Sequence, residues 1–268
     1  PDGTLRAPET RWGGIMRKLE STDFEATNIE YIEFWLMDPF IENPYHSGGK
    51  LYFNLGEVSE DILRDGRKSF ENGLPISSEI IDVDSTIWGR VPKLQAVVNA
   101  FSNDPQSRQY QDIGYDGLSS TDERNYHQTF LQKIQNQVEA QAYNNILADP
   151  SADDFTYFRN QSYDQNDIKI TDRYKKYNNT EGNSSVVSDN SQYSSQATSL
   201  PNVEDINQDN TLSEAENYYE YIINLTPGDM VIGKNCITDI QEATSVPLPN
   251  GETTNCKWYQ FKIPIREP

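Results

Sequence analysis

The feature that most restricts the fold of this chain is a two-residue alternation of apolar side chains in its short segments. Within residues 29–37, Ile32, Phe34 and Leu36 fall on one face of an extended chain, because successive side chains of a β-strand point to opposite faces. We predict that this face points toward a core. Similar strand-like segments are residues 12–19, 50–55, 218–225, 230–237 and 257–266. We therefore expect a mainly β fold.

The expected arrangement is a β-sandwich of the jelly-roll, galactose-binding-like type, with a long inserted helix and an EF-hand-like calcium loop. The helix is predicted over about residues 121–147, because Ser120 and Glu123 match a capping box at its start. Apolar residues recur along this segment at helical spacing, which is typical of a packing face. They are Tyr126, Phe130, Leu131, Ile134 and Val138. A short helix is also expected over residues 58–65.

Composition excludes several classes of function. Lys and Arg total 22 and Asp and Glu total 42, which gives a net charge of −20. A nucleic-acid partner and an anionic membrane surface both require clustered positive charge, so neither is expected. Apolar residues make up 35% of the chain, yet aromatic residues reach 11%, which is too many for a disordered chain. This balance favours an extracytoplasmic β domain over a cytosolic enzyme.

We expect residues 1–268 to form a single extracytoplasmic domain of a larger protein, because no signal peptide opens the chain. The segment at residues 178–202 is dominated by Asn, Ser, Thr and Gln and has no Lys or Arg. Such a composition buries too little apolar area to offset the entropy of ordering, so we predict a flexible loop there. The expected order is strands in 1–118, the helix in 119–150, this loop, and then the calcium loop with C-terminal strands in 203–268.

The sharpest chemical motif is the acidic dodecapeptide at residues 205–216. Calcium binds six to eight oxygen ligands, and a twelve-residue loop presents them at positions one, three, five, seven, nine and twelve. The predicted ligands are Asp205, Asn207, Asp209, Thr211 through its carbonyl, Ser213 and Glu216. Leu212 is the usual apolar residue at position eight, and Asn210 stands where the motif has Gly. Asn also tolerates a left-handed turn, so we predict a structural Ca²⁺ ion; the alternative is a solvated acidic loop.

Two cysteines, Cys236 and Cys256, are the disulfide candidates. The alternative is two free buried thiols, and no Cys/His cluster accompanies them that would indicate zinc.

Nothing in the sequence indicates catalysis. The histidines are His46 and His127, and neither belongs to a metalloprotease motif or to a recognisable triad. Glu30 and Glu33 would face opposite sides of one strand, so they do not form a glycosidase pair. We therefore expect no enzymatic activity, no catalytic residues and no organic cofactor.

A calcium-dependent carbohydrate-binding module is the alternative function. Jelly rolls often bind sugars on exposed aromatic rings, and four residues would suit that use: Trp12, Trp35, Tyr45 and Trp88. The competing interpretation is that these rings fill the core.

Six motifs in order resemble segments of the SprA (Sov) family of Bacteroidetes. They are Arg11–Arg17, Asn28–Trp35, Gly49–Asp61, Gln111–Leu118, Arg173–Asn179 and Glu204–Asp209. The resemblance covers most of the chain and is weak only through residues 184–200.

The resemblance implies a non-enzymatic structural or interaction domain of the type IX secretion (gliding motility) translocon, an outer-membrane β-barrel that exports folded proteins. It also implies the partners, which are the remainder of the parent barrel and other secretion-system proteins or secreted cargo, with no nucleic acid and no direct lipid contact. The fragment would lie in a periplasmic or surface-exposed portion of the outer membrane. The family motif carries the acids of the calcium loop over to Asp205, Asn207, Asp209 and Glu216.

Overall fold

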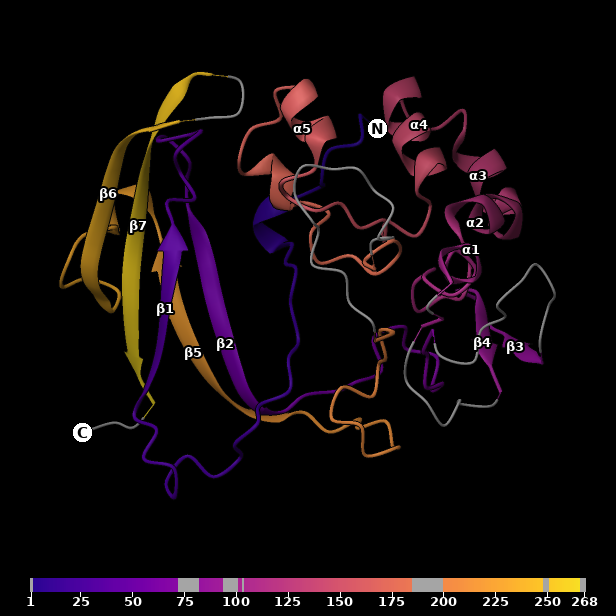
Figure 1. Cartoon of the computed structure of the whole chain (residues 1–268), viewed down its shortest axis with the longest axis horizontal. Coiled ribbons are helices and arrows are strands. Elements are labelled where there is room, and N and C mark those ends of the chain that lie inside the picture. The colour runs from indigo at the N-terminus through magenta and orange to yellow at the C-terminus, as the bar shows by residue number, and fades with distance from the viewer. Residues whose placement is uncertain are drawn as a thin grey trace. The chain divides into compact units, whose positions relative to one another are not determined.

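The computed structural model describes residues 2–71, 82–93, 101–102, 104–184, 200–247 and 251–265 (Figure 1). The chain forms two compact units. Unit 1 comprises Pro1–Ile15 and Ser59–Ala215, and unit 2 comprises Met16–Val58 and Glu216–Pro268. Each unit is described on its own below. The expectation of a single extracytoplasmic domain stays a prediction.

Unit 2 contains two antiparallel sheets. The first has the order β1–β7–β6, with β1 at Tyr31–Met37, β6 at Ile237–Pro247 and β7 at Thr253–Pro264. The second pairs β2 at Gly49–Glu57 with β5 at Asn217–Leu225. A 3₁₀ turn at Pro227–Asp229 follows β5. Both sheets join segments far apart in sequence, because β1 and β2 pair with strands from the end of the chain.

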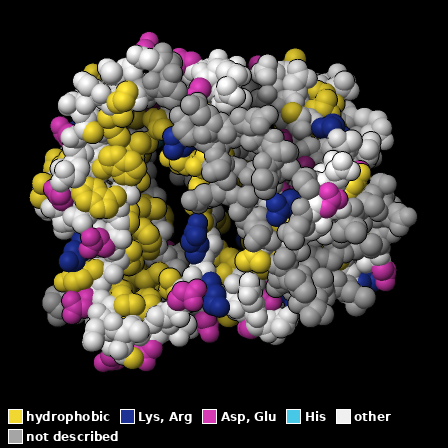
Figure 2. Space-filling model, viewed as in Figure 1, with side chains coloured by type: hydrophobic (Ala, Val, Ile, Leu, Met, Phe, Trp, Pro, Cys, Tyr) yellow, Lys and Arg dark blue, Asp and Glu magenta, His cyan; other side chains and the backbone are white. Residues whose placement is uncertain are grey.

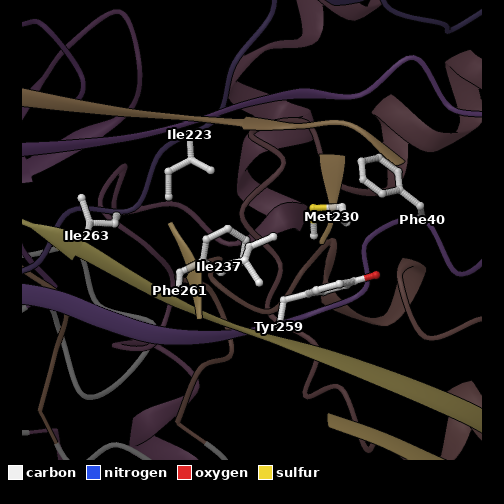
Figure 3. Packing of buried hydrophobic residues seen from close by; sticks show 7 residues of the cluster. All are labelled: Phe40, Ile223, Met230, Ile237, Tyr259, Phe261 and Ile263. Atoms are coloured by element: carbon white, nitrogen blue, oxygen red, sulfur yellow. The ribbon is translucent and has the colours of Figure 1, made fainter. Parts of the chain in front are cut away.

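The core of unit 2 lies between these strands (Figure 3). Phe261 has no exposed surface, and its ring stacks on Phe34 with centroids 4.9 Å apart. Phe34 also contacts Phe53 of β2 at 5.1 Å. The buried cluster consists of Phe40, Ile223, Met230, Ile237, Tyr259, Phe261 and Ile263. Ile32, Phe34 and Leu36 pack against it, which confirms the face that the alternation predicted.

The opposite face of the β1–β7–β6 sheet is partly aromatic. Tyr31, Trp35 and Trp258 are each about 40% exposed, at 44%, 42% and 39%. Polar contacts lie between them: the Gln260 amide donates to Glu33 at 2.6 Å, and Lys262 lies over the Tyr31 ring. In Figure 2, hydrophobic side chains gather over the strands of unit 2 on the face in view. We call the Tyr31, Trp35 and Trp258 surface the aromatic face.

Unit 1 is built from short helices, turns and one small ribbon. The helices are α1 at Pro105–Arg108, α2 at Ser120–Tyr126, α3 at Gln128–Ile134, α4 at Ala140–Ala148 and α5 at Gln161–Gln165. The ribbon pairs β3 at Val83–Ser85 with β4 at Arg90–Pro92. Two 3₁₀ turns lie at Pro8–Thr10 and Asp172–Tyr174.

Two of the predicted strands are wrong. Residues 12–19 form no strand, and Trp12 and Ile15 stay 85% and 66% exposed. Two glycines at 13 and 14 remove side chains that a strand would pack, so nothing favours pairing there. Residues 230–236 form turns and bends, because Gly233, Asn235 and Cys236 all have positive φ. The actual strand β6 begins where that prediction ended.

The single long helix is also wrong, since its segment forms α2, α3 and α4. Helices in proteins are stabilised mainly by packing of an apolar face, and this face is only partly buried. Tyr126 is 39% exposed and Phe130 is 52% exposed, while Leu131 is buried. The cap is Ser119 rather than Ser120, because the Ser119 hydroxyl accepts the N–H of Asp122.

Residues 58–65 do not form the expected helix: 58–61 have no regular structure and 62–65 form bends. The Asp61 carboxylate accepts the N–H groups of Asp65 and Gly66 at 3.1 Å each. Such local side-chain bonds compete with helix formation. The prediction of a flexible loop at 178–202 falls largely on residues 185–199, which lie outside the described residues.

The mainly β prediction is confirmed, with antiparallel pairing between all named strands. The jelly-roll type is not confirmed, because a jelly roll has eight strands and the described part of unit 2 has five. Among the described helices, none combines the length and the hydropathy that crossing a membrane requires.

Candidate functional site

Three acidic side chains from separate segments of unit 1 lie together. Asp116 is in the turn-rich segment after α1, Glu123 is on α2, and Asp153 is in the loop after α4. Each offers a carboxylate oxygen, and these oxygens all lie within 4.8 Å of one another. Within the described residues, this is the one group of three such side chains, histidine and cysteine included, that meets this distance. We call it the acidic cluster.

Backbone and side-chain contacts from one loop hold the cluster. Ser151 donates twice, from its hydroxyl to Asp116 Oδ2 at 2.8 Å and from its N–H to Glu123 Oε2 at 2.9 Å. Asp149 Oδ1 accepts the N–H of Asp153 at 3.0 Å, which closes the turn between them. The loop after α4 therefore supplies one member of the cluster and orients the other two.

Gly114 provides the space that Asp153 occupies. Its φ is +78°, and a Cβ atom there would lie 2.2 Å from Asp153 Oδ2. No side chain can be placed at that distance without displacing the carboxylate. The glycine therefore permits the close approach of two segments that the cluster requires.

Two oxygen atoms of the cluster have no hydrogen-bond partner. Glu123 has no exposed surface, and its Oε1 atom is unpartnered, as is the buried Oδ1 atom of Asp153. An unpaired carboxylate oxygen removed from water costs free energy comparable to a lost charged hydrogen bond. These two atoms therefore keep hydrogen-bonding capacity that no group in the described part of the chain uses.

Burial and mutual repulsion favour the protonated forms of these acids. Desolvation raises the pKa of Asp116 to about 6 and that of Glu123 to about 7. Desolvation, with repulsion from the neighbouring carboxylates, raises the pKa of Asp153 to about 8, and the same causes raise that of Glu181 to about 8. The local hydrogen bonds, which act to lower the pKa values of Asp116, Glu123 and Glu181, therefore only partly offset the cost of burying these carboxylates.

Two cationic side chains in the region of the cluster pair with other acids. Lys176 Nζ lies 2.7 Å from Asp149 Oδ2 and 3.8 Å from Asp154. Arg90 pairs with Asp122 at 3.3 Å and lowers the pKa of Asp116 only as a minor cause. Within the described residues, neither cation forms an ion pair with Asp116, Glu123 or Asp153.

A second group of buried acids joins loops of unit 1. Glu71 has no exposed surface and accepts the N–H groups of Gly114 and Asn202 at 2.7 and 3.0 Å. Asp112 accepts the N–H groups of Gly182 and Ser184 at 3.2 and 2.9 Å. Both oxygens of each acid are used in this way, so these residues stabilise the loops rather than offer free ligands.

The predicted calcium loop has a defined conformation. Asp205 is 2% exposed, and its two oxygens accept the N–H groups of Asp209 at 3.1 Å and Asn210 at 2.9 Å. Asn210 has a φ of +69°, which is the left-handed turn expected at position six. Asn207 and Asp209 likewise accept N–H groups within the loop, from Asp209 and Thr211.

The acids of this loop do not converge in the way the acidic cluster does. Asp205, Asp209 and Glu216 form no group with oxygens within 4.8 Å of one another. Lys68 Nζ lies 3.8 Å from Asp205 Oδ2. β5 begins directly after Glu216, so the exit is a strand and an EF-hand helix is not confirmed. Calcium binding by this loop stays a prediction.

Glu60 and Glu204 are structural residues of the same region that the sequence analysis missed. Glu60 accepts the N–H groups of Asn207 and Ser213 at 3.2 and 3.0 Å, so it fixes the dodecapeptide from outside. Glu204 accepts those of Leu63 and Ser69 at 2.9 and 2.8 Å. Nothing in the local sequence distinguishes these two acids from exposed ones.

The acidic cluster was missed as well, although one local signal was present. Asp149, Ser151 and Asp153 alternate along the chain, as oxygen ligands do in the first half of a calcium loop. Asp116 and Glu123 join them only through the fold.

The disulfide prediction is wrong, because both cysteines are free. Cys256 is on β7, where it pairs with Ala243 of β6. Cys236 lies beside another position of β7, because its carbonyl accepts the N–H of Lys262. Cys256 and Lys262 are six residues apart along the extended strand, which corresponds to about 20 Å. A disulfide requires Cα atoms within about 7 Å.

The aromatic residues considered for sugar binding are all exposed. The exposed fraction is 85% for Trp12, 42% for Trp35, 96% for Tyr45 and 43% for Trp88. Trp12 and Trp88 belong to unit 1, and the other two belong to unit 2. No ring–ring contact within the described residues joins any two of them. A common sugar platform therefore has no support.

Fold and site together define an acidic, mainly antiparallel β protein with a buried carboxylate cluster. Residues 129–268 match the SprA_N family of motility related/secretion proteins. The match covers more than half of the 268 residues, so the chain belongs to this family, as its six motifs predicted. No curated protein matches the chain. The family associates the chain with secretion and motility and with the cell envelope.

Proposed function

We propose that this chain is a non-enzymatic structural or interaction domain of a type IX secretion (gliding motility) translocon in the outer membrane. The observation that carries the proposal is the family match over residues 129–268. The chain contacts the remainder of its parent protein and either other secretion-system proteins or secreted cargo. It has no catalytic role, and it contacts neither nucleic acid nor lipid directly.

The two sheets of unit 2 support a scaffold role. Among the described strands neither sheet closes on itself, so the outer strands present backbone groups to which another chain can add. The aromatic face adds three amphipathic rings, and Tyr and Trp are enriched in protein interfaces. The net charge of −20 opposes binding to phosphate-rich surfaces. A structural Ca²⁺ ion in the loop Asp205–Glu216 is part of this proposal.

The test is a secretion assay in the bacterium that makes the parent protein. Trp35→Ser combined with Trp258→Ser removes two rings of the aromatic face and leaves the opposite, buried face intact. We expect less cargo in the culture medium and more in the cells, at an unchanged amount of the parent protein. The matched control is Trp12→Ser with Tyr45→Ser, which removes two exposed rings elsewhere.

Two results would contradict the proposal. One is normal secretion and motility in the Trp35 and Trp258 variant. The other is turnover of a glycoside or peptide substrate by the purified chain that disappears in Glu123→Gln, because Glu123 is the buried acid with a free oxygen.

A further inference from the structure

We propose that Asp116, Glu123 and Asp153 form a calcium-binding site in unit 1, separate from the dodecapeptide at residues 205–216. The first observation is geometric. Two oxygens on opposite sides of a Ca²⁺ ion are about 4.6 to 5.2 Å apart, since Ca–O distances are 2.3–2.6 Å. The three oxygens of the cluster, all within 4.8 Å of one another, fit around one such ion.

The second observation is independent of the clustering. Glu123 Oε1 and Asp153 Oδ1 are buried and accept no hydrogen bond. By contrast, both oxygens of Glu71 and both oxygens of Glu204, which are as fully buried as Glu123, accept backbone N–H groups. Asp65 Oδ2 and Asp164 Oδ1 also accept no hydrogen bond, but among the described residues only in the cluster do two such oxygens belong to a group of converging carboxylates. We infer a ligand from this combination.

The chemistry of the donors selects the class of ion. All three side chains offer carboxylate oxygens, which hard cations prefer and soft metals do not. A divalent ion also offsets the charge that Lys176 leaves uncompensated, because Lys176 is bound to Asp149. Burial favours the protonated acids when no cation is bound, so protons are the competing occupant.

Calcium is favoured over magnesium by the way the ligands are held. Asp116, Glu123 and Asp153 come from three segments whose spacing is set by the N–H and hydroxyl of Ser151 and by Gly114. Mg²⁺ demands near-ideal octahedral geometry at 2.0–2.1 Å and keeps several waters. Ca²⁺ accepts variable geometry and more protein oxygens, and Glu181 and Asp149 stand beside the cluster.

The experiment measures the melting temperature of the whole chain against Ca²⁺ concentration after removal of divalent ions with a chelator. We expect Ca²⁺ to raise the melting temperature, because an ion that binds only the folded state stabilises it. Glu123→Gln and Asp153→Asn should each weaken the apparent affinity at least about tenfold. Equilibrium dialysis with radioactive Ca²⁺ gives the number of bound ions directly.

The variants also give a readout in the absence of calcium. Glu123→Gln removes a buried negative charge, and its amide can donate to the neighbouring carboxylate. We therefore expect its melting temperature in chelator to equal or exceed that of the wild type. The matched control is Asp122→Asn on the same helix, whose exposed carboxylate pairs with Arg90 outside the cluster. It should keep the full calcium response.

A further variant separates the two calcium proposals. Asp209→Ala with Glu216→Ala removes acids of the dodecapeptide and should leave the response of the cluster unchanged. The cluster proposal is overturned if Glu123→Gln and Asp153→Asn keep the full response, or if the wild type shows none. Equal stabilisation by Mg²⁺ at the same concentration would contradict the assignment to calcium.

Discussion

Glu123 and Glu204 are both buried completely, yet their oxygens are used differently. Both oxygens of Glu204 accept backbone N–H groups, which ties two loops together and uses the carboxylate fully. One oxygen of Glu123 accepts the N–H of Ser151, and the other has no hydrogen-bond partner. The environment of each residue, rather than its type, therefore separates a structural acid from a candidate ligand.

Glu71 should make the stability of the chain depend on pH. Burial, with repulsion from Asp112 and Asp153, raises its pKa well above 4.5, although N–H groups of Gly114 and Asn202 act against the shift. The folded state thus holds a proton that the unfolded state releases near pH 4.5. The stabilisation is complete below that pH and is lost as the pH rises through the raised pKa.

We therefore expect the free energy of unfolding, measured with urea in the presence of chelator, to fall as the pH rises from about 4.5 toward neutrality. The fall should be smaller in Glu71→Gln, which cannot ionise. Glu9→Gln, at an exposed position of the same unit, should follow the wild type. Identical pH profiles for Glu71→Gln and the wild type would refute this assignment.

For single residues, the sequence predicts local conformation within one segment, but it does not predict a site that residues from several segments form together. The left-handed turn at Asn210 follows from its place in the dodecapeptide, and the structure has it. The acidic cluster combines residues 116, 123 and 153, and no local pattern records that the folded chain brings them within 4.8 Å. The alternation of Asp149, Ser151 and Asp153 was the part of the site that could be recognised.

The strands that could be predicted from the sequence are those with one clearly buried face. β1, β2, β5 and β7 alternate as expected, because large apolar side chains on one face enter the core. β6 was missed since it is an edge strand with register shifts, and most of its side chains are exposed. Residues 12–19 show the reverse error, with apolar side chains but no partner strand.

The stacked pair Phe34–Phe261 should carry much of the stability of unit 2. Phe261→Ala leaves a cavity in the fully buried centre of the cluster and should lower the free energy of unfolding by about 3–5 kcal/mol. Urea denaturation followed by circular dichroism measures this change.

Gln260→Ala is the matched control, because it lies next along β7 on the opposite face and donates to Glu33. Its cost should be about 1 kcal/mol, the usual net value of one hydrogen bond. Equal costs for the two substitutions would mean that the packing between the sheets does not dominate the stability of this unit.

For the whole molecule, the excess of acidic residues decides how salt acts. The ion pairs are mostly exposed, and exposed pairs are worth about 0–1 kcal/mol each, so screening them costs little. The net charge of −20 instead destabilises the compact state by self-repulsion, which screening relieves. The second effect should prevail, because 42 acidic residues face only 22 basic ones.

We therefore expect the melting temperature in chelator to rise with sodium chloride as the Debye length shortens from about 30 Å at 0.01 M to about 8 Å at 0.15 M. Differential scanning calorimetry measures the change. Choline chloride at equal ionic strength should give the same rise, since a large organic cation screens charge without entering a carboxylate site. A falling melting temperature would show that the ion pairs outweigh the repulsion, and a rise specific to sodium would indicate bound ions in place of screening.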